Sequence, residues 1–364
     1  QGLEWTDAMQ AGIAEILDGQ EQRHELFVEY MDAMRLPIGT PDSQAAQEFL
    51  HHLLARYAGQ DVDFVLVTDN RALDFLLAHR EALAKDVPVV FCGINSYSPA
   101  LLRGQTNITG IAETPSFGET IEMALGLDPG VSRILFLGED TMTGNANIEI
   151  LQRQTAGFAG RVEITVRKER EIIALEEEVA GLGPEWAVLL ATRPVENRRI
   201  LPLGTAVRRL TAACPTPIYV AWHEFMGHGP VGGIIITAHS QGKAAARLAL
   251  GILNGESADA LPVLLESPNI PMADFQAMQR FGYSTTKLPA GTEVLNRPVS
   301  FYEQHARLVW IYGGITLSLA GLAALLLVNT ARRVAAENAL RMSEQNYRAV
   351  VEGVEAGILL QDSS

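Results

Sequence analysis

The chain has 364 residues, of which 48% are hydrophobic and 20% are charged, and its formal net charge is -15 at pH 7. This composition is typical of a folded chain that buries a core, and the length is enough for about two domains. The acidity argues against nucleic acid or another polyanion as the main partner. The two cysteines, Cys92 and Cys214, cannot form a disulfide framework, and each lies beside an apolar strand-like run where we expect it to be buried.

Short apolar runs alternate with amphipathic helical stretches along most of the chain. The predicted strands are residues 26–30, 64–68, 87–92, 108–111, 134–138, 162–166, 187–191, 218–221 and 233–237. The predicted helices are residues 5–17, 44–57, 72–83, 117–127, 145–155, 172–180, 206–213 and 241–253. This alternation indicates parallel sheets with helices on both faces. Because one such sheet rarely takes so many strands, we expect two lobes of about four to six strands each.

Residues 308–328 form an apolar run without a charged side chain. About 20 apolar residues in a helix cross a hydrocarbon core of about 30 Å, so this run predicts a membrane span rather than a buried core helix. Trp310 and Tyr312 near its start suit an interfacial aromatic belt. One face of the run carries three small residues, Gly314, Ser318 and Gly321. Such a stripe favours the close approach of two helices, so we expect a homodimer.

The residues beyond the span indicate its orientation. Arg332 and Arg333 follow its end directly. Since basic residues concentrate on the cytoplasmic side of a span, we expect residues 1–307 outside the membrane and residues 329–364 in the cytoplasm.

Polar side chains follow six of the predicted strands. Ligands bind at the carboxyl ends of strands in open parallel sheets, so these side chains are expected to line one cleft, although each alone could equally be a capped turn. Carboxylates there would take an amine or hydroxyls, Arg193 would take a carboxylate, and aromatic rings would form a wall. The candidate ligand-binding residues are Asp69, Asn70, Asn95, Ser96, Tyr97, Glu113, Thr114, Phe117, Glu139, Asp140, Thr141, Arg193, Trp222 and Glu224.

Two literal motif matches do not have the context that their chemistry needs. Residues 227–232 match GxGxxG, but an apolar run follows the motif, whereas a dinucleotide site needs a strand before it and a helix opening within it. His223 and His228 are five apart, and zinc ligands on one helical face need a spacing of four. We therefore expect no catalytic residue, no metal and no cofactor. The pair of His223 and Glu224 is the only candidate for an enzyme, and no nucleophile accompanies it.

Several blocks of the sequence resemble a known family. They are DFVLVTDNRALDFLLAHR, VPVVFCGIN, NITGIAETPSFGETIEMAL, WHEFMGHGPVGG, QGKAAARLALGILNG, LPVLLESPN and LNRPVSFYEQH. These blocks resemble the periplasmic sensor region of bacterial transmembrane receptors, which is similar to the substrate-binding proteins of ABC transporters. The resemblance implies an α/β, two-lobed fold of the type I periplasmic-binding-protein kind, with parallel sheets flanked by helices, followed by one transmembrane helix.

The resemblance also implies domain bounds. The sensor domain would take residues 1–300, with lobe 1 at about 1–113 and 236–258 and lobe 2 at about 114–235 and 259–285. The transmembrane helix at 308–328, a juxtamembrane helix at 329–343 and the start of a PAS domain, a helix and a strand, at 344–364 would follow. Family members open with a strand before the segment that begins here at Gln1, so we expect the first central strand to be absent. They continue into a histidine kinase or a diguanylate cyclase, and neither catalytic signature occurs in this sequence.

The implied role is ligand sensing in two-component or related signal transduction, at the bacterial inner membrane with residues 1–307 periplasmic. A small molecule, amino-acid-like or an aromatic metabolite, would bind between the lobes, and lobe closure would pass through the membrane helix to the PAS and output domains. The expected partners are this ligand, membrane lipid and a second copy, and not nucleic acid. The alternative is a domain that docks a periplasmic protein, or only dimerises, without a small-molecule ligand. A cleft lined by the candidate residues would favour sensing, and an exposed apolar patch would favour docking.

Overall fold

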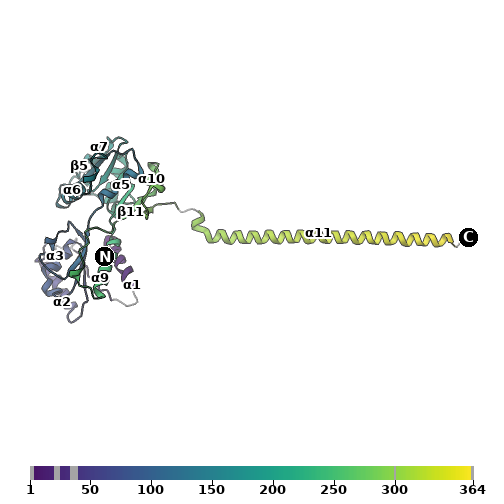
Figure 1. The fold of residues 1–364 in the computed structure, drawn as a ribbon, viewed down its shortest axis with the longest axis horizontal. Helices are drawn as coiled ribbons and strands as arrows, with labels where there is room; N and C mark the ends of the chain where they lie inside the picture. Colours follow the sequence, from purple (N-terminus) through teal and green to yellow (C-terminus); the bar gives the residue numbers. More distant parts are fainter. Residues whose placement is uncertain (1–3, 20–24, 33–39, 299–300, 362–364) are drawn as a thin grey trace. The chain divides into compact units, whose positions relative to one another are not determined.

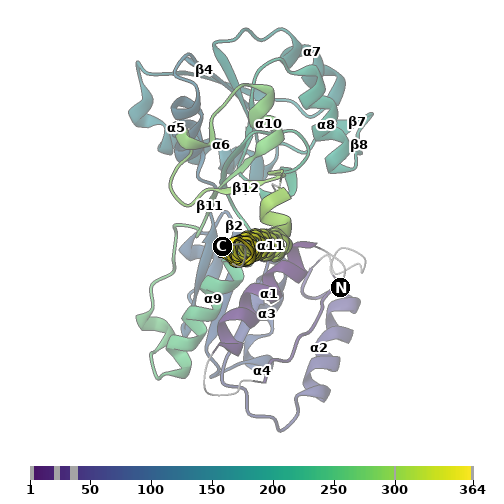
Figure 2. The ribbon, with the colours of Figure 1, turned by 90° about the vertical axis from the view of Figure 1, so that its right-hand side faces the viewer.

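The computed structural model describes residues 4–19, 25–32, 40–298 and 301–361. The chain divides into two compact units, Gln1–Arg297 and Pro298–Ser364. The first unit contains two α/β lobes with separate sheets, and the second is one long helix (Figure 1). Figure 2 separates the helices of the two lobes, with α1, α2, α4 and α9 in one and α5, α7, α8 and α10 in the other.

Lobe 1 is built on a sheet of three parallel strands in the order β1-β2-β3. The strands are β1 (Val65–Thr68), β2 (Val89–Asn95) and β3 (Ile108–Glu113). The helices are α1 (Glu4–Asp18), α2 (Gln44–Arg56), α3 (Asn70–Ala78), α4 (Arg80–Leu83) and α9 (Ala238–Leu253). Side chains alternate along β2, so that Val90 and Cys92 pack with α1 and α9, whereas Val89 and Phe91 pack with α3. Helices therefore cover both faces of the sheet, as parallel strands require.

Two glycines allow α1 and α9 to lie against each other. A Cβ atom on Gly12 would overlap the carbonyl oxygen of His239, and one on Gly242 would overlap that of Met9. The backbones of the two helices thus meet directly. Because α9 comes from the second half of the chain, this contact joins the two ends of lobe 1.

Lobe 2 is built on a sheet of seven strands in the order β12-β11-β10-β9-β6-β4-β5. The strands are β4 (Arg133–Gly138), β5 (Glu163–Lys168), β6 (Trp186–Leu190), β9 (Ile218–Val220), β10 (Gly232–Ile235), β11 (Ile270–Asp274) and β12 (Glu293–Leu295). All neighbours are parallel except β10 and β11. Between β6 and β9 the chain also forms a short, separate hairpin of β7 (Val195–Glu196) and β8 (Arg199–Ile200).

Two cores cover the faces of the lobe 2 sheet. Ile134 and Phe136 of β4 belong to the core formed with α5 (Phe117–Leu127), α6 (Met142–Gln154) and α10 (Phe275–Arg280). The alternating residues Leu135 and Leu137 belong to the core formed with α7 (Ile172–Ala180) and α8 (Leu203–Ala213). This period of two explains why β4 reads as one continuous apolar run.

The chain crosses between the lobes three times. It passes from β3 to α5, from β10 to α9, and from the segment after η4 (Ala258–Ala260) to β11. Leu264 still belongs to lobe 1, because it pairs with Ile111 of β3 in an isolated bridge. We call these three crossings the hinge. Since β3 ends at the first crossing, the carboxyl ends of the lobe 1 strands lie at the hinge.

The second unit is the helix α11 (Phe301–Gln361), which departs from helical geometry at His305. Within the described residues, Gln304–Glu352 is the one helical stretch that is long and apolar enough to cross a membrane, judged by length and composition only. Its apolar side chains are exposed in the chain by itself. The strand predicted within residues 344–364 is wrong for the described part, where the helix continues to Gln361. A strand needs a neighbour for its backbone groups, and a helix pairs them internally.

Most predicted elements agree with the structure within a few residues, and the exceptions have physical reasons. The strand predicted at residues 26–30 is wrong, because residues 25–32 contain no helix or strand. β1 is an edge of its sheet, and this segment instead contacts α2, where Arg56 Nε lies 2.9 Å from Glu29 Oε1 and Phe27 packs on Tyr57. The single helix predicted at residues 72–83 divides at His79. The expectation of four to six strands in each lobe is also wrong, because the sheets contain three and seven.

Candidate functional site

The side-chain amide of Asn70, directly after the turn that follows β1, pairs with the backbone of Asn95 at the end of β2. Asn70 Nδ2 donates to the Asn95 carbonyl oxygen at 3.1 Å, and the Asn95 N–H donates to Asn70 Oδ1 at 2.9 Å. Asp69 begins α3, and its carboxylate accepts the Asn70 N–H at 2.7 Å. Asp69 has a φ of 78°, which non-glycine residues rarely adopt. This pairing thus holds Asp69 at the carboxyl end of β1, where its side chain keeps contact with solvent.

Ser96 and Tyr97 follow the end of β2. Ser96 is exposed and has a φ of 54°. The Tyr97 ring stacks on the ring of Phe91, with centroids 5.4 Å apart and planes at 26°. Partial burial raises the pKa of the Tyr97 hydroxyl. Tyr97 therefore rests on the lobe 1 core with part of its ring still accessible.

Glu113 ends β3 and connects the two lobes. It is 8% exposed, and one of its carboxylate oxygens accepts the Trp222 Nε1–H at 3.1 Å. Trp222 follows β9, so this bond joins strand ends of the two sheets. Burial raises the pKa of Glu113 to about 7, the bond from Trp222 opposes this rise, and the charges of Asp69 and Glu224 add to it. The ionisation of Glu113 therefore responds to a carboxylate of each lobe.

Residues of the first crossing support this bond. The Phe117 ring meets the Trp222 ring edge-on at 5.9 Å, but Phe117 itself is 0% exposed and belongs to the lobe 2 core. Asn269 from the third crossing donates to the Thr114 carbonyl oxygen at 2.9 Å and to Ser116 Oγ at 3.0 Å. Phe117 thus supports Trp222 from behind, and Thr114 contributes a backbone oxygen to the hinge.

A buried amide joins the second crossing to lobe 1. Gln241, at the start of α9, is 0% exposed. Its Oε1 accepts the Gly93 N–H at 3.3 Å, and its Nε2 donates to Ser267 Oγ at 2.6 Å. All three crossings are therefore held by hydrogen bonds to side chains, which makes the hinge a defined structure.

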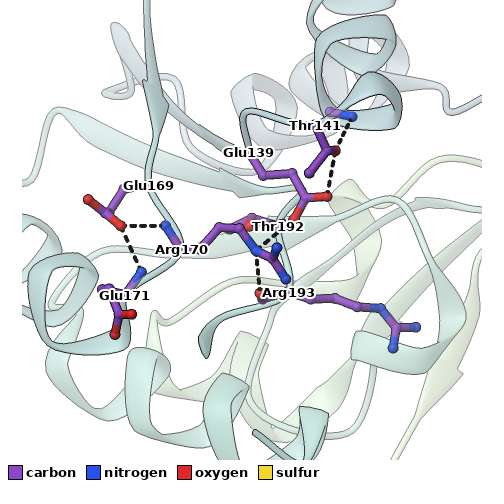
Figure 3. Close-up of polar contacts among 8 residues, drawn as sticks. Glu139, Thr141, Glu169, Arg170, Glu171, Thr192 and Arg193 are labelled. Atoms are coloured by element: carbon purple, nitrogen blue, oxygen red, sulfur yellow. Dashed lines mark hydrogen bonds and ion pairs between the residues drawn. The ribbon is translucent and has the colours of Figure 1, made fainter. Parts of the chain in front are cut away.

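The carboxyl ends of β4, β5 and β6 carry a connected polar cluster (Figure 3). Glu139 accepts hydrogen bonds from Thr141 Oγ1 at 2.9 Å and from Thr192 Oγ1 at 3.2 Å. Arg170 Nε lies 3.2 Å from Glu139 Oε2 and also donates to the Arg193 carbonyl oxygen at 3.3 Å. Both oxygens of Glu139 are thus occupied, and Thr141 also caps α6 by accepting the Gly144 N–H at 3.0 Å.

Arg193 and Glu224 form an ion pair at the ends of β6 and β9, through Arg193 Nη2 and Glu224 Oε1. The neighbouring loop is held by acidic side chains. Glu169 Oε1 accepts the N–H groups of Arg170 and Glu171 at 2.6 Å and 2.7 Å, as Figure 3 shows. The lobe 2 side of the site therefore pairs its carboxylates with guanidinium groups.

The structure brings some of the predicted residues together and leaves others apart. Glu113 bonds to Trp222 and Arg193 pairs with Glu224 at the hinge, where the charge of Asp69 also acts on Glu113; Asn70 pairs with Asn95, and Glu139 accepts from Thr141. Asp140 lies apart, because its side chain is 77% exposed and faces Lys168 Nζ at 3.7 Å. Phe117 is buried and cannot meet a ligand in this conformation.

Sequence reasoning missed several residues of the site. Arg170 and Thr192 are each the second residue after a strand, β5 and β6, so the rule that selected Glu139 applies to them as well. Gln241 and Asn269 carry no comparable signal, because the first is on a helix and the second lies in an irregular segment before β11. Their role depends on crossings that only the folded chain brings together.

Over the described part of the chain, no group of three or more His, Cys, Asp or Glu side chains could hold a metal ion. His223 lies in the short turn η3 (His223–Phe225) rather than on a longer helix. His228 Nδ1 lies 3.1 Å from Arg208 Nη1. The two histidines thus belong to different surroundings.

No protein-family model matches the chain, and no curated protein matches it. Solved structures do resemble it. A ligand-free, open substrate-binding protein with adhesive properties from Clostridium difficile has a TM-score of 0.59 at 14% identity, covering 81% of this chain and 96% of that one. An ABC domain in complex with L-Trp from Streptococcus pneumonia has a TM-score of 0.50 at 16% identity, covering 80% of this chain and 96% of that one.

At these identities the likeness concerns the fold alone. The chain has the two-lobed α/β fold of type I periplasmic-binding-like proteins, with helices on the faces of parallel sheets. The fold class that the sequence predicted is therefore confirmed. The expected resemblance to ABC-transporter binding proteins is confirmed for the fold.

Proposed function

We propose that the chain is the sensor region of a bacterial inner-membrane receptor, which binds a small molecule between its two lobes. Residues 1–307 would be periplasmic, and residues 308–328 would be the transmembrane helix in contact with lipid. Residues 329–343 would lead to a PAS domain beginning at residues 344–364 and then to an output domain of the histidine kinase or diguanylate cyclase type. The chain itself would be a non-enzymatic part of this receptor.

The observation that carries the proposal is the Glu113–Trp222 hydrogen bond at the hinge. It places polar strand ends of both lobes beside each other, at the position where open parallel sheets bind ligands. Glu113 and Asp69 come from lobe 1, whereas Trp222, Glu224 and Arg193 come from lobe 2. A ligand that contacts both groups would favour a closed arrangement of the lobes over an open one.

The proposed contact residues fall into three groups. Asp69, Asn70, Asn95, Ser96 and Tyr97 would act from lobe 1, and Glu113, Thr114 and Trp222 would act at the hinge. Glu139, Thr141, Arg193 and Glu224 would act from lobe 2, with Phe117 supporting Trp222, whereas Asp140 faces Lys168 away from the other residues. Carboxylates, guanidinium groups and aromatic rings together suit an amino-acid-like or aromatic metabolite.

The signal would pass as a change of lobe separation. Closure moves the chain segment that leaves lobe 2 after β12 and enters α11. A second copy in the membrane, approached through Gly314, Ser318 and Gly321, would turn this movement into a change between the two transmembrane helices.

The test measures lobe closure in the whole chain, held in lipid nanodiscs. Ala82 on α4 and Gln152 on α6 are exposed, and both native cysteines are buried, so A82C and Q152C accept spin labels selectively. A metabolite library is first screened for an increase in melting temperature, because binding to the native state stabilises it. The inter-label distance is then expected to shorten with each hit.

A matched control places both labels in lobe 2, on Gln152 and on the exposed residue Glu149. Their separation should not change with the ligand. A library without hits, together with recovery of a periplasmic protein on the immobilised chain, would overturn ligand sensing and support protein docking as the function. Hits that leave the lobe 1 to lobe 2 distance unchanged would overturn closure.

A further inference from the structure

The carboxylate of Glu113 has an unusual environment for a buried acid. It is 8% exposed, yet the only donor that meets it among the described residues is the Trp222 indole N–H. Its second oxygen accepts no hydrogen bond from that part of the chain. Glutamate is rarely buried unless it is paired, because an ionised carboxylate loses its hydration. Glu113 thus lacks a partner that its chemistry requires.

The charged groups around Glu113 do not supply this partner. Its neighbours with charge are Asp69 after β1 and Glu224 in η3, and both are carboxylates. Cys92 of β2 is also close enough to feel the charge of Glu113, and burial raises the pKa of that thiol to about 12, so it stays neutral. Arg193 is engaged with Glu224. Burial raises the pKa of Asp69 and the charge of Arg71 opposes this rise, so the hinge carboxylate that no positive group in the described part of the chain compensates is Glu113.

Lobe 2 shows what a compensated carboxylate looks like in this protein. Glu139 receives two hydroxyl donors and the Arg170 guanidinium. Glu113 receives a single neutral N–H. The difference marks Glu113 as the acid whose counter-ion is not part of the fold.

We infer that the ligand carries a positively charged nitrogen group, which enters the hinge beside the carboxylate of Glu113. This inference rests on the proposed function and specifies its ligand class. An ammonium donates up to three hydrogen bonds, and one of them would fill the second oxygen of Glu113, which accepts none from the described residues.

A positive group at this position has a measurable consequence. Because the pKa of Glu113 is raised to about 7, part of the population holds a proton at neutral pH. A cation that binds beside the carboxylate favours the ionised form, so binding releases a proton. Affinity should decrease as pH falls below about 7, by about tenfold or more between pH 8 and pH 5. A neutral ligand would show neither effect.

The experiment uses the 364-residue chain in nanodiscs and pairs of probes that differ in charge. The pairs are 2-phenylethylamine with 2-phenylethanol, tryptamine with tryptophol, and putrescine with 1,4-butanediol. We expect at least one amine to raise the melting temperature at pH 8 while its alcohol does not. Calorimetry in two buffers of different ionisation enthalpy should then show proton release at pH 7.

Substitutions separate the charge from the shape of the site. E113Q keeps the oxygen that accepts the Trp222 N–H, so the fold is retained, and it should lower amine affinity about tenfold or more and abolish proton release. The control E149Q changes an exposed glutamate on α6 and should leave both unchanged. Correct folding of E113Q is checked by its circular dichroism.

Each outcome decides one question. If an alcohol stabilises the chain as much as its amine, or if E113Q binds the amine as tightly as the parent chain, the inference about charge is wrong while ligand binding stands. If neither member of any pair binds, the inference is also wrong. Sensing is then judged separately, by the metabolite screen and the lobe-closure distances described above.

Discussion

The two lobes share an α/β architecture but differ in the size of their sheets and in the partners of their carboxylates. Lobe 2 has seven strands with a core on each face, and the carboxylates at its strand ends are paired with arginines. Lobe 1 has three strands, depends on the direct contact of α1 with α9, and leaves Glu113 at the hinge without an arginine or lysine partner among the described residues. The carboxylates of lobe 2 are thus stabilised within the fold itself, and lobe 1 is the part that a bound ligand would stabilise most.

The largest expected effect tests whether the lobes are independent units. Phe136 in β4 and Phe91 in β2 are both 0% exposed. Replacing either with alanine should cost about 3–5 kcal/mol, because the change leaves a cavity. Hydrogen exchange should then increase in lobe 2 for F136A and in lobe 1 for F91A, with wild-type lobe 1 exchanging faster than lobe 2. Equal loss of protection in both lobes with either variant would mean that they unfold as one.

The second effect concerns the uncompensated acid of lobe 1. Its native pKa of about 7 exceeds the ordinary 4.5, so the native state binds this proton more tightly than the unfolded chain. Stability contributed by Glu113 is therefore present below pH 4.5, decreases as pH rises and is lost above pH 7, by up to about 3 kcal/mol. Urea unfolding at pH 5 and pH 8 should show this difference in the parent chain and in E149Q, and a smaller one in E113Q. An identical pH trend in E113Q would remove Glu113 as its cause.

The third effect tests how lobe 1 depends on the α1–α9 contact. G12A places a Cβ atom against the His239 carbonyl oxygen and should cost about 1–3 kcal/mol. The matched change G126A on α5 meets nothing within 4 Å and should be neutral or stabilise the chain by up to about 1 kcal/mol. Thermal unfolding compares the two variants. Equal melting temperatures would show that the helices have room to move apart.

The smallest effect tests the completed network of lobe 2. R170M leaves Glu139, whose side chain is 19% exposed, without its ion-pair partner and should cost about 1–2 kcal/mol. R161M removes an exposed ion pair with Glu122 and should leave stability nearly unchanged. Denaturant titrations of both variants make the comparison. If R170M unfolds at the parent midpoint, the network does not stabilise lobe 2.

The sequence predicted helices and strands well where the hydrophobic period was unbroken. The bounds of α5 and α7 agree exactly with residues 117–127 and 172–180. Buried parallel strands such as β4 and β6 have apolar side chains on both faces, and such runs are easily recognised. β11 and β12 were missed, because β11 contains Pro271 and β12 has only three residues.

The candidate site was predicted less completely than the fold. The rule of strand carboxyl ends found Glu113, Trp222, Arg193 and Glu224, which the folded chain does link at the hinge. The same rule selected Asp140, which points to solvent, and Phe117, which lies in the core. The position after a strand determines where the backbone of a residue lies, whereas packing determines which way its side chain points.

The sequence by itself determined an α/β chain with polar strand ends and an apolar helix long enough to cross a membrane, because these properties depend on local periodicity and length. Only the tertiary structure decided that Glu113 and Trp222 meet, and that Glu139 has an arginine partner while no described arginine pairs with Glu113. Such pairings join residues up to 109 positions apart, and no local pattern encodes them. We infer the ligand class from the lack of a described positive charge beside Glu113, and that lack can be seen only in the folded chain.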